Sequence, residues 1–111
     1  MVAHRPPPPS GYRERTFHSQ DGLELYFREY GNPRDRRPAI LCLPGVTRNS
    51  KDFHNLARHL AGGWRVLCPD YRGRGRSAYD PDWRHYQPRT YVDDIRQLLA
   101  ATDVHRVVVI G

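Results

Sequence analysis

The stretch RVLCPDYRGRGRS, residues 65–77, decides the fold prediction. It begins with a short apolar run that has the character of a buried strand, and Pro69 is expected to end that strand. A long loop rich in glycine, arginine, aspartate and tyrosine follows and extends to Arg89. Loops that leave the end of a strand in this way often carry functional residues. The stretch therefore predicts a parallel strand that delivers a loop to a functional rim.

Apolar and alternating runs on both sides of this strand predict the rest of a sheet. Residues 39–43 and 107–110 are continuous apolar runs, typical of strands buried on both faces. Residues 12–19 and 23–30 alternate and are rich in aromatic side chains, and the turn Gln20-Asp21-Gly22 between them indicates a hairpin. The order strand, strand, strand, helix, strand, helix, strand predicts an α/β fold, with an antiparallel hairpin followed by parallel βαβαβ units.

Two helices are predicted between these strands. Ser50 is the expected cap of the first, and Gly62-Gly63 should end it. Thr90 with Asp93 three residues on resembles a capping box at the start of the second. The positions expected to face the core are Phe53, Leu56, Ala57 and Leu60 in the first helix, and Val92, Ile95, Leu98 and Leu99 in the second.

Composition places the chain among globular domains. It has 111 residues, 38% hydrophobic and 27% charged, and its longest apolar runs are far shorter than a membrane helix requires. The start has no secretory pattern, so we expect a cytoplasmic location. We expect a proline-rich disordered leader over residues 1–11 and a single domain, cut short before its nucleophile, over residues 12–111. The formal charge of +6 comes from scattered arginines, which favours a solvated basic surface.

The cysteines and histidines predict neither a metal site nor a cofactor. Cys42 and Cys68 each lie inside an apolar run, where thiols usually serve as small hydrophobes. Two cysteines are too few for a zinc site, and without an export signal a disulfide is not expected. The histidines form no HxH or HExxH pattern.

Chemistry is expected beyond the carboxyl ends of the parallel strands, where open α/β sheets bind ligands. After the 39–43 strand, Gly45 permits a tight turn and leaves the backbone N–H of Val46 free to stabilise an oxyanion. Gly45, Val46 and Thr47 are therefore the candidate substrate-pocket residues. Taken alone, these residues favour an ordinary strand-to-helix turn.

The arginine-rich loop predicts a structural role. Its glycine spacing lacks the third glycine of GxGxxG and no helix follows at once, so a nucleotide site is not expected. Asp70 and Arg72 should hold the loop by hydrogen bonds and charge pairing, while Gly73 and Gly75 take positive φ angles. Three aromatic side chains of the loop either line an apolar pocket or pack on the surface: Tyr79, Trp83 and Tyr86.

Together these motifs resemble α/β-hydrolase-fold enzymes, over about residues 12–111. The resemblance rests on the segment from Thr47 to Phe53, the PDxRGxGxS pattern that begins at Pro69, the TYxxD start of the second helix, and a strand ending in Ile-Gly. It implies that this chain is the amino-terminal part of such a fold. Many members have His-Gly where this chain has Pro44-Gly45, which leaves the subfamily undefined.

The resemblance also implies where catalysis would reside. In the family, the strand corresponding to residues 107–110 enters a GxSxG nucleophile elbow, and Gly111 matches its first glycine. The acid and the histidine follow the nucleophile in the chain, so no catalytic residue is assigned within residues 1–111. A complete domain would hydrolyse an ester or related acyl bond of a small molecule by serine attack, although related members use aspartate on epoxides and halides. We expect no specific nucleic acid and no membrane as partner, and the oligomeric state is open.

Two other interpretations stand beside this one. The chain as given lacks a nucleophile, so it is either a catalytically inert truncated product or an incomplete record, and its last strand would be an aggregation-prone edge. Alternatively, the run Arg72–Arg76, with Tyr71 and Tyr79 nearby, forms a nucleic-acid-binding module. We rank this last, because the run is short, unrepeated and explained by the family loop.

Overall fold

The computed structural model describes residues 11–45 and 50–111. Within these ranges the strands form a single mixed sheet in the order β1-β2-β4-β3-β5. The strands are β1 (Arg13–His18), β2 (Glu24–Tyr30), β3 (Ala39–Cys42), β4 (Val66–Pro69) and β5 (Val107–Ile110). Pro69, which was expected to end the strand at residue 68, is instead the last residue of β4 and lies opposite Phe27 of β2.

Strand pairing confirms the predicted fold class. β1 and β2 form the antiparallel hairpin, in a register that runs from Arg13 opposite Glu29 to His18 opposite Glu24. β3 lies between β4 and β5 and pairs with both in parallel, while β2 joins β4 in the antiparallel direction. The parallel strands therefore end together along one side of the sheet, here called the carboxyl edge. The opposite side, where they begin, is called the amino edge.

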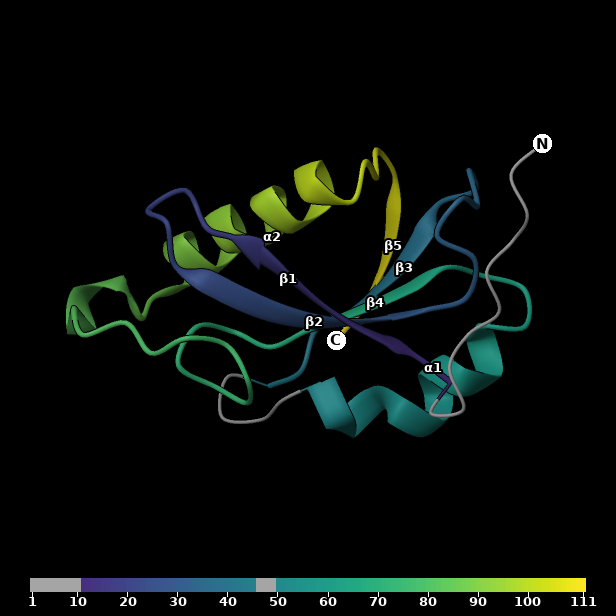
Figure 1. Cartoon of the computed structure of the whole chain (residues 1–111), viewed down its shortest axis with the longest axis horizontal. Coiled ribbons are helices and arrows are strands. Elements are labelled where there is room, and N and C mark those ends of the chain that lie inside the picture. Colours follow the sequence, from purple (N-terminus) through teal and green to yellow (C-terminus); the bar gives the residue numbers. More distant parts are fainter. Residues whose placement is uncertain (1–10, 46–49) are drawn as a thin grey trace.

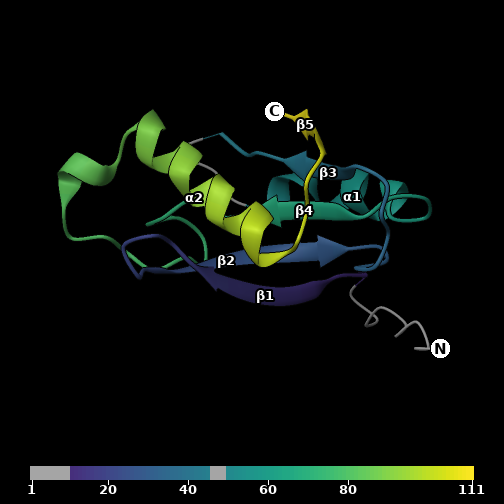
Figure 2. The same ribbon diagram turned by 90° about the horizontal axis from the view of Figure 1, so that it is seen from above.

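One helix covers each face of the sheet. α1 (His54–Leu60) follows a 3-10 turn η1 (Ser50–Phe53), and α2 (Pro88–Ala101) follows a second 3-10 turn η2 (Trp83–His85). Figure 1 shows α2 above the sheet and α1 below it, and Figure 2 shows α2 crossing the face that α1 does not occupy. This layering is the one that right-handed βαβ crossovers produce.

Each helix helps to bury its own apolar cluster. Alternation along β2 divides its side chains between the two faces, because successive residues of a strand point to opposite sides. The cluster on the α2 face consists of Phe17, Leu25, Phe27, Leu41, Leu67 and Leu98. The cluster on the α1 face consists of Tyr30, Ile40, Cys42, Ala57, Val66 and Cys68.

Both predicted helix starts are wrong. α1 begins after η1, and its cap residue Phe53 makes no side-chain capping bond, so Ser50 is not a helix cap. α2 begins at Pro88, two residues before Thr90, and its cap residue is Gln87. The physical reason is that proline has the φ angle of a helix and needs no amide partner at the first helical position.

Two predicted inward positions are also wrong. Leu56 is 41% exposed and Val92 is 51% exposed. In α2 the buried stripe passes through Asp94 and Leu98, four residues apart, which turns Val92 away from the sheet. The sequence pattern placed Leu98 on this face correctly but missed Asp94, because a carboxylate is not expected at a buried helix position.

The remaining predictions of chain organisation fall partly outside the described residues. The predicted leader falls on residues 1–11, of which only Gly11 is described, and the proposed domain boundary stays a prediction. In the described part of the chain, no helix combines the length and apolar character needed to cross a membrane.

Candidate active site at the carboxyl edge

The carboxyl edge brings together the ends of β3 and β5. Cys42 lies opposite Ile110, and the Leu43 N–H donates to the Ile110 carbonyl at 2.8 Å. The segment that leaves β3 and the residue that follows β5, Gly111, therefore start side by side. Gly45 is described and exposed, whereas Val46 and Thr47 lie outside the described residues. The oxyanion role assigned to the Val46 N–H thus stays a prediction.

Asp70 follows β4 at the same edge and joins two distant segments. Its carboxyl group is 3% exposed and accepts the Ser50 N–H at 2.5 Å and the Arg76 N–H at 2.9 Å. Its backbone carbonyl accepts from the Ser77 hydroxyl at 2.7 Å, and that hydroxyl accepts the Tyr26 N–H at 2.9 Å. Asp70 therefore fixes the start of η1 to the arginine-rich loop, and the loop to β2.

Two glycines shape this loop. Gly73 and Gly75 have φ angles of +74° and +52°, a region that side chains other than glycine rarely adopt. A Cβ atom on Gly73 would overlap the Tyr86 ring, and one on Gly75 would overlap the Asp70 carboxyl group. Backbone conformation and close approach thus both require glycine at position 75.

Gly75→Ala is expected to destabilise the protein by about 1–3 kcal/mol, because left-handed strain is added to displacement of the Asp70 carboxylate. Gly22→Ala is the matched control, since Gly22 has a φ of +88° with open space around its Cα. The control should show strain alone and therefore a smaller loss. Urea denaturation of both variants measures the difference, and equal losses would contradict the packing argument.

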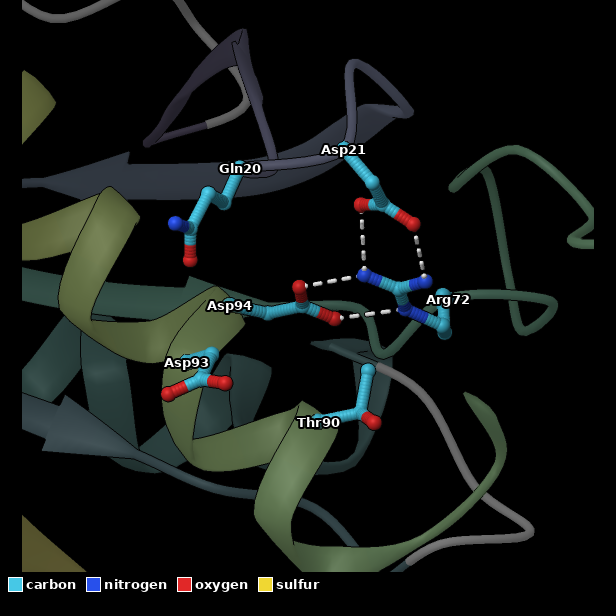
Figure 3. Close-up of a pocket in the computed structure, with 6 residues that line it drawn as sticks. All are labelled: Gln20, Asp21, Arg72, Thr90, Asp93 and Asp94. Atoms are coloured by element: carbon cyan, nitrogen blue, oxygen red, sulfur yellow. Dashed lines mark hydrogen bonds and ion pairs between the residues drawn. The ribbon is translucent and has the colours of Figure 1, made fainter. Parts of the chain in front are cut away.

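Arg72 is the centre of a buried ion cluster. Its side chain is 2% exposed and donates two hydrogen bonds to Asp94, at 2.8 and 2.6 Å. It donates two more to Asp21, both at 3.1 Å, and one to Asp80 at 2.7 Å. Figure 3 shows the guanidinium between Asp21, from the hairpin turn, and Asp94, from α2. The cluster ties the hairpin, the loop and α2 together.

The surroundings of Arg72 indicate a structural role rather than a ligand site. The cavity beside it has a volume of about 230 Å³ and is lined by Gln20, Asp21, Arg72, Thr90, Asp93 and Asp94 (Figure 3). Ligand atoms of Asp21, Asp80 and His85 lie within 4.8 Å of one another, as metal ligands would. Both carboxylates already bind Arg72, however, and His85 Nδ1 lies 2.6 Å from Asp80. The guanidinium supplies the positive charge that these groups need.

Acid should weaken the part of this cluster that depends on Asp21. Hydrogen bonds from Arg72 first, and then from Ser19, lower the pKa of Asp21 well below its ordinary 3.8. A carboxylate with a lowered folded pKa stabilises the protein fully above its unfolded pKa, and this contribution is lost as the pH falls through that value toward the folded pKa. Asp21→Asn should therefore lower the melting temperature near pH 7 and reduce the further drop between about pH 7 and about pH 3. Thermal unfolding at both pH values checks this, and an unchanged drop would contradict it.

The other residues singled out from the sequence face solvent, brace the loop after β4 or serve the core. Tyr79 and Trp83 are 73% and 80% exposed. The Tyr86 hydroxyl accepts the Asp80 N–H at 2.8 Å and donates to the Asp80 carbonyl at 2.9 Å, so this ring braces the loop. Cys42 and Cys68 are buried and unbridged.

Sequence reasoning missed the partners of Arg72. Asp21, Asp80 and Asp94 come from a turn, a loop and a helix, where aspartate is ordinarily a solvated or capping residue. The one available signal was Asp94, which lies four residues before Leu98 and hence on the same face of α2. Nothing in the sequence indicated that the Asp70 carboxylate bonds to Ser50.

Comparison with known proteins shows which family this chain is similar to. A family model described as "alpha/beta hydrolase fold" matches residues 38–111. A 3-hydroxybutyrate-oligomer hydrolase of Cupriavidus necator is 40% identical over 83 residues, which cover 75% of this chain and 28% of that protein. A serine hydrolase-like protein of Danio rerio is 37% identical over 79 residues, which cover 71% of this chain and 24% of that protein.

A solved structure of an α/β hydrolase is similar to this chain in both fold and sequence. The crystal structure of an α/β hydrolase from Novosphingobium aromaticivorans superposes with a TM-score of 0.85 at 51% sequence identity. The match covers 91% of this chain and 35% of that one. The chain thus spans about a quarter to a third of the length of the proteins it matches.

Proposed function

Because the chain belongs to the α/β-hydrolase fold family, we propose that it forms the amino-terminal part of a domain that hydrolyses ester or related acyl bonds with a serine nucleophile. The observation that best supports this proposal is the contact between the ends of β3 and β5, where the Leu43 N–H donates to the Ile110 carbonyl. In a nucleophile elbow, the oxyanion hole needs one N–H from the loop after β3 and one from the residue after the nucleophile. Adjacent strand ends are the geometry that such a pair of donors requires.

The proposed mechanism assigns few roles within residues 1–111. The Val46 N–H would donate to the oxyanion that forms when the serine attacks the acyl carbon. The serine would lie two residues beyond Gly111, and the acid and the histidine would follow it. No Gly-x-Ser-x-Gly pattern occurs within residues 1–111, so we propose that these residues by themselves do not turn over esters.

The names of two relatives support serine over aspartate as the nucleophile. One is called serine hydrolase-like, and the other hydrolyses 3-hydroxybutyrate oligomers, which are esters. We infer that short aliphatic esters are the substrate class to test first. Epoxide or halide chemistry, which the family fold also accommodates, would instead require an aspartate at the elbow.

The alternative that the arginine-rich loop binds nucleic acid has less support than the hydrolase proposal. Arg72 is buried among carboxylates, and Arg76 lies 2.8 Å from Glu14, so the arginine run is engaged within the protein. We propose that no specific nucleic acid binds this loop. Binding that survives about 0.15 M salt and is lost on Arg74→Gln would contradict this.

The test is ester hydrolysis by the complete protein. We expect turnover of p-nitrophenyl butyrate and of 3-hydroxybutyrate oligomers by the complete protein, and none above buffer by residues 1–111 alone. Turnover by residues 1–111 alone would overturn the proposed location of the nucleophile. Absence of turnover by the folded complete protein on both substrates would overturn the proposed reaction class.

A further inference from the structure

A basic groove lies at the amino edge of the sheet, far from the proposed chemistry. Its volume is about 700 Å³, and it lies between the loop that joins β2 to β3 and the loop that joins α2 to β5. The Ala39 N–H donates to the Arg106 carbonyl at 3.1 Å, which places the groove where β3 and β5 begin. Five arginines line it: Arg34, Arg36, Arg37, Arg65 and Arg106.

Two of these arginines are already neutralised and build the groove wall. Arg65 is 5% exposed, donates to Glu29 at 2.9 and 2.7 Å, and donates to the Thr102 carbonyl at 3.0 Å. Arg37 makes a two-point contact with Asp35 at 3.1 and 2.7 Å. The Arg65 contacts tie the residue before β4 to β2 and to the end of α2, and both arginines keep little positive charge for a ligand.

The other three arginines are exposed and have no carboxylate partner within ion-pair distance in the described part of the chain. The Arg34 backbone N–H donates to the Asn32 side-chain oxygen at 2.9 Å, and the Arg106 carbonyl accepts the Ala39 N–H at 3.1 Å. Two carboxylates line the groove: Asp35, which Arg37 neutralises, and Asp103, which is highly exposed and lies 3.1 Å from His105. Three guanidinium groups thus face one carboxylate that already has a basic neighbour.

The negative end of α2 also faces this side, and its effect is limited. The Leu98 carbonyl accepts the Thr102 N–H at 3.0 Å, and the Leu99 carbonyl accepts the Val104 N–H at 2.9 Å. Carbonyls that are paired in this way repel an anion less than free ones, because the dipole effect acts through unsatisfied groups. The net field in the groove is therefore positive.

We propose that this groove binds a small polyanion that carries two or more phosphate groups. Arginine presents a planar fork that matches phosphate oxygens in pairs, and no lysine lines the groove. The volume lies within the range of about 300–1,000 Å³ that small-molecule sites occupy. Because the groove and the carboxyl edge lie at opposite ends of the strands, the inference is independent of the proposed function.

The test uses the complete protein and inorganic tripolyphosphate, with calorimetry at about 0.15 M salt. The groove variant carries Arg34→Gln, Arg36→Gln and Arg106→Gln. The matched control carries Arg58→Gln, Arg89→Gln and Arg96→Gln, which remove the same charge from exposed helix positions. We expect the groove variant to bind at least about tenfold more weakly than the control, because a fork contact is lost as well as charge.

Two results would overturn the proposal. Equal weakening in both triple variants would mean that tripolyphosphate responds only to net charge. Absence of saturable binding to the unmutated protein at millimolar tripolyphosphate would mean that the groove is an ordinary solvated surface. Citrate is the second probe, and citrate binding as tight as that of tripolyphosphate would contradict the assignment to phosphate.

Discussion

Arg72→Met is expected to lower the free energy of unfolding by about 3–5 kcal/mol, the range for removing one partner of a buried ion pair. The change leaves Asp94 and Asp80, both nearly buried, without the guanidinium that compensates them. It also detaches the hairpin turn at Asp21 from α2. Urea denaturation of the complete protein measures the loss.

Two further variants separate charge from geometry in this cluster. Arg72→Lys keeps the charge but loses the fork, so we expect an intermediate loss. Arg84→Gln removes an exposed arginine whose partner is the nearby Asp82, and solvent screening should make its effect on stability small. An Arg72→Met loss as small as that of Arg84→Gln would contradict the role given to the cluster.

Asp70→Asn is expected to lower kcat of the complete protein about a hundredfold while KM changes little, as when one oxyanion donor is removed. The segment that carries Val46 is anchored before it by the Leu43 N–H and after it by the Ser50 N–H. Asparagine has one carbonyl oxygen for two amide donors, so either Ser50 or Arg76 would meet an NH2 group instead. The prediction rests on the proposed function and makes Asp70 a positioning residue.

Asp94→Asn is the matched control for Asp70→Asn. The two carboxyl groups are similarly buried, at 4% and 3% exposed, but Asp94 accepts from the Arg72 guanidinium, whereas Asp70 accepts the Ser50 N–H. We expect Asp94→Asn to lower stability and to leave kcat per folded molecule unchanged. If both variants lose kcat equally, Asp70 acts through stability alone and the positioning role is wrong.

The arrangement of strands was predictable because it depends on local pattern and chirality. Continuous apolar runs gave β3, β4 and β5, and the alternating runs around Asp21 gave the hairpin. The helix starts were not predictable from capping preference alone, because Pro88 begins α2 before Thr90 can cap it. The capping preference of Thr90 indicated the wrong start, because the preference of proline for the first helical position had already begun the helix at Pro88.

The candidate site was predictable only in outline. Strand order and the family resemblance placed it at the carboxyl edge, since parallel strands end there. The contacts that stabilise it join residues far apart in the chain, such as Asp21 with Arg72 and Ser50 with Asp70. No periodicity links such residues, and only the folded geometry shows that they meet.

The proposed serine nucleophile is tested most directly by labelling the complete protein with a fluorophosphonate and mapping the adduct by mass spectrometry. Such a probe reacts with a serine that is activated by a base and stabilised by an oxyanion hole. We expect one adduct, on a serine two residues beyond Gly111. An adduct on Ser19, Ser50 or Ser77, or no adduct on a protein that hydrolyses esters, would contradict it.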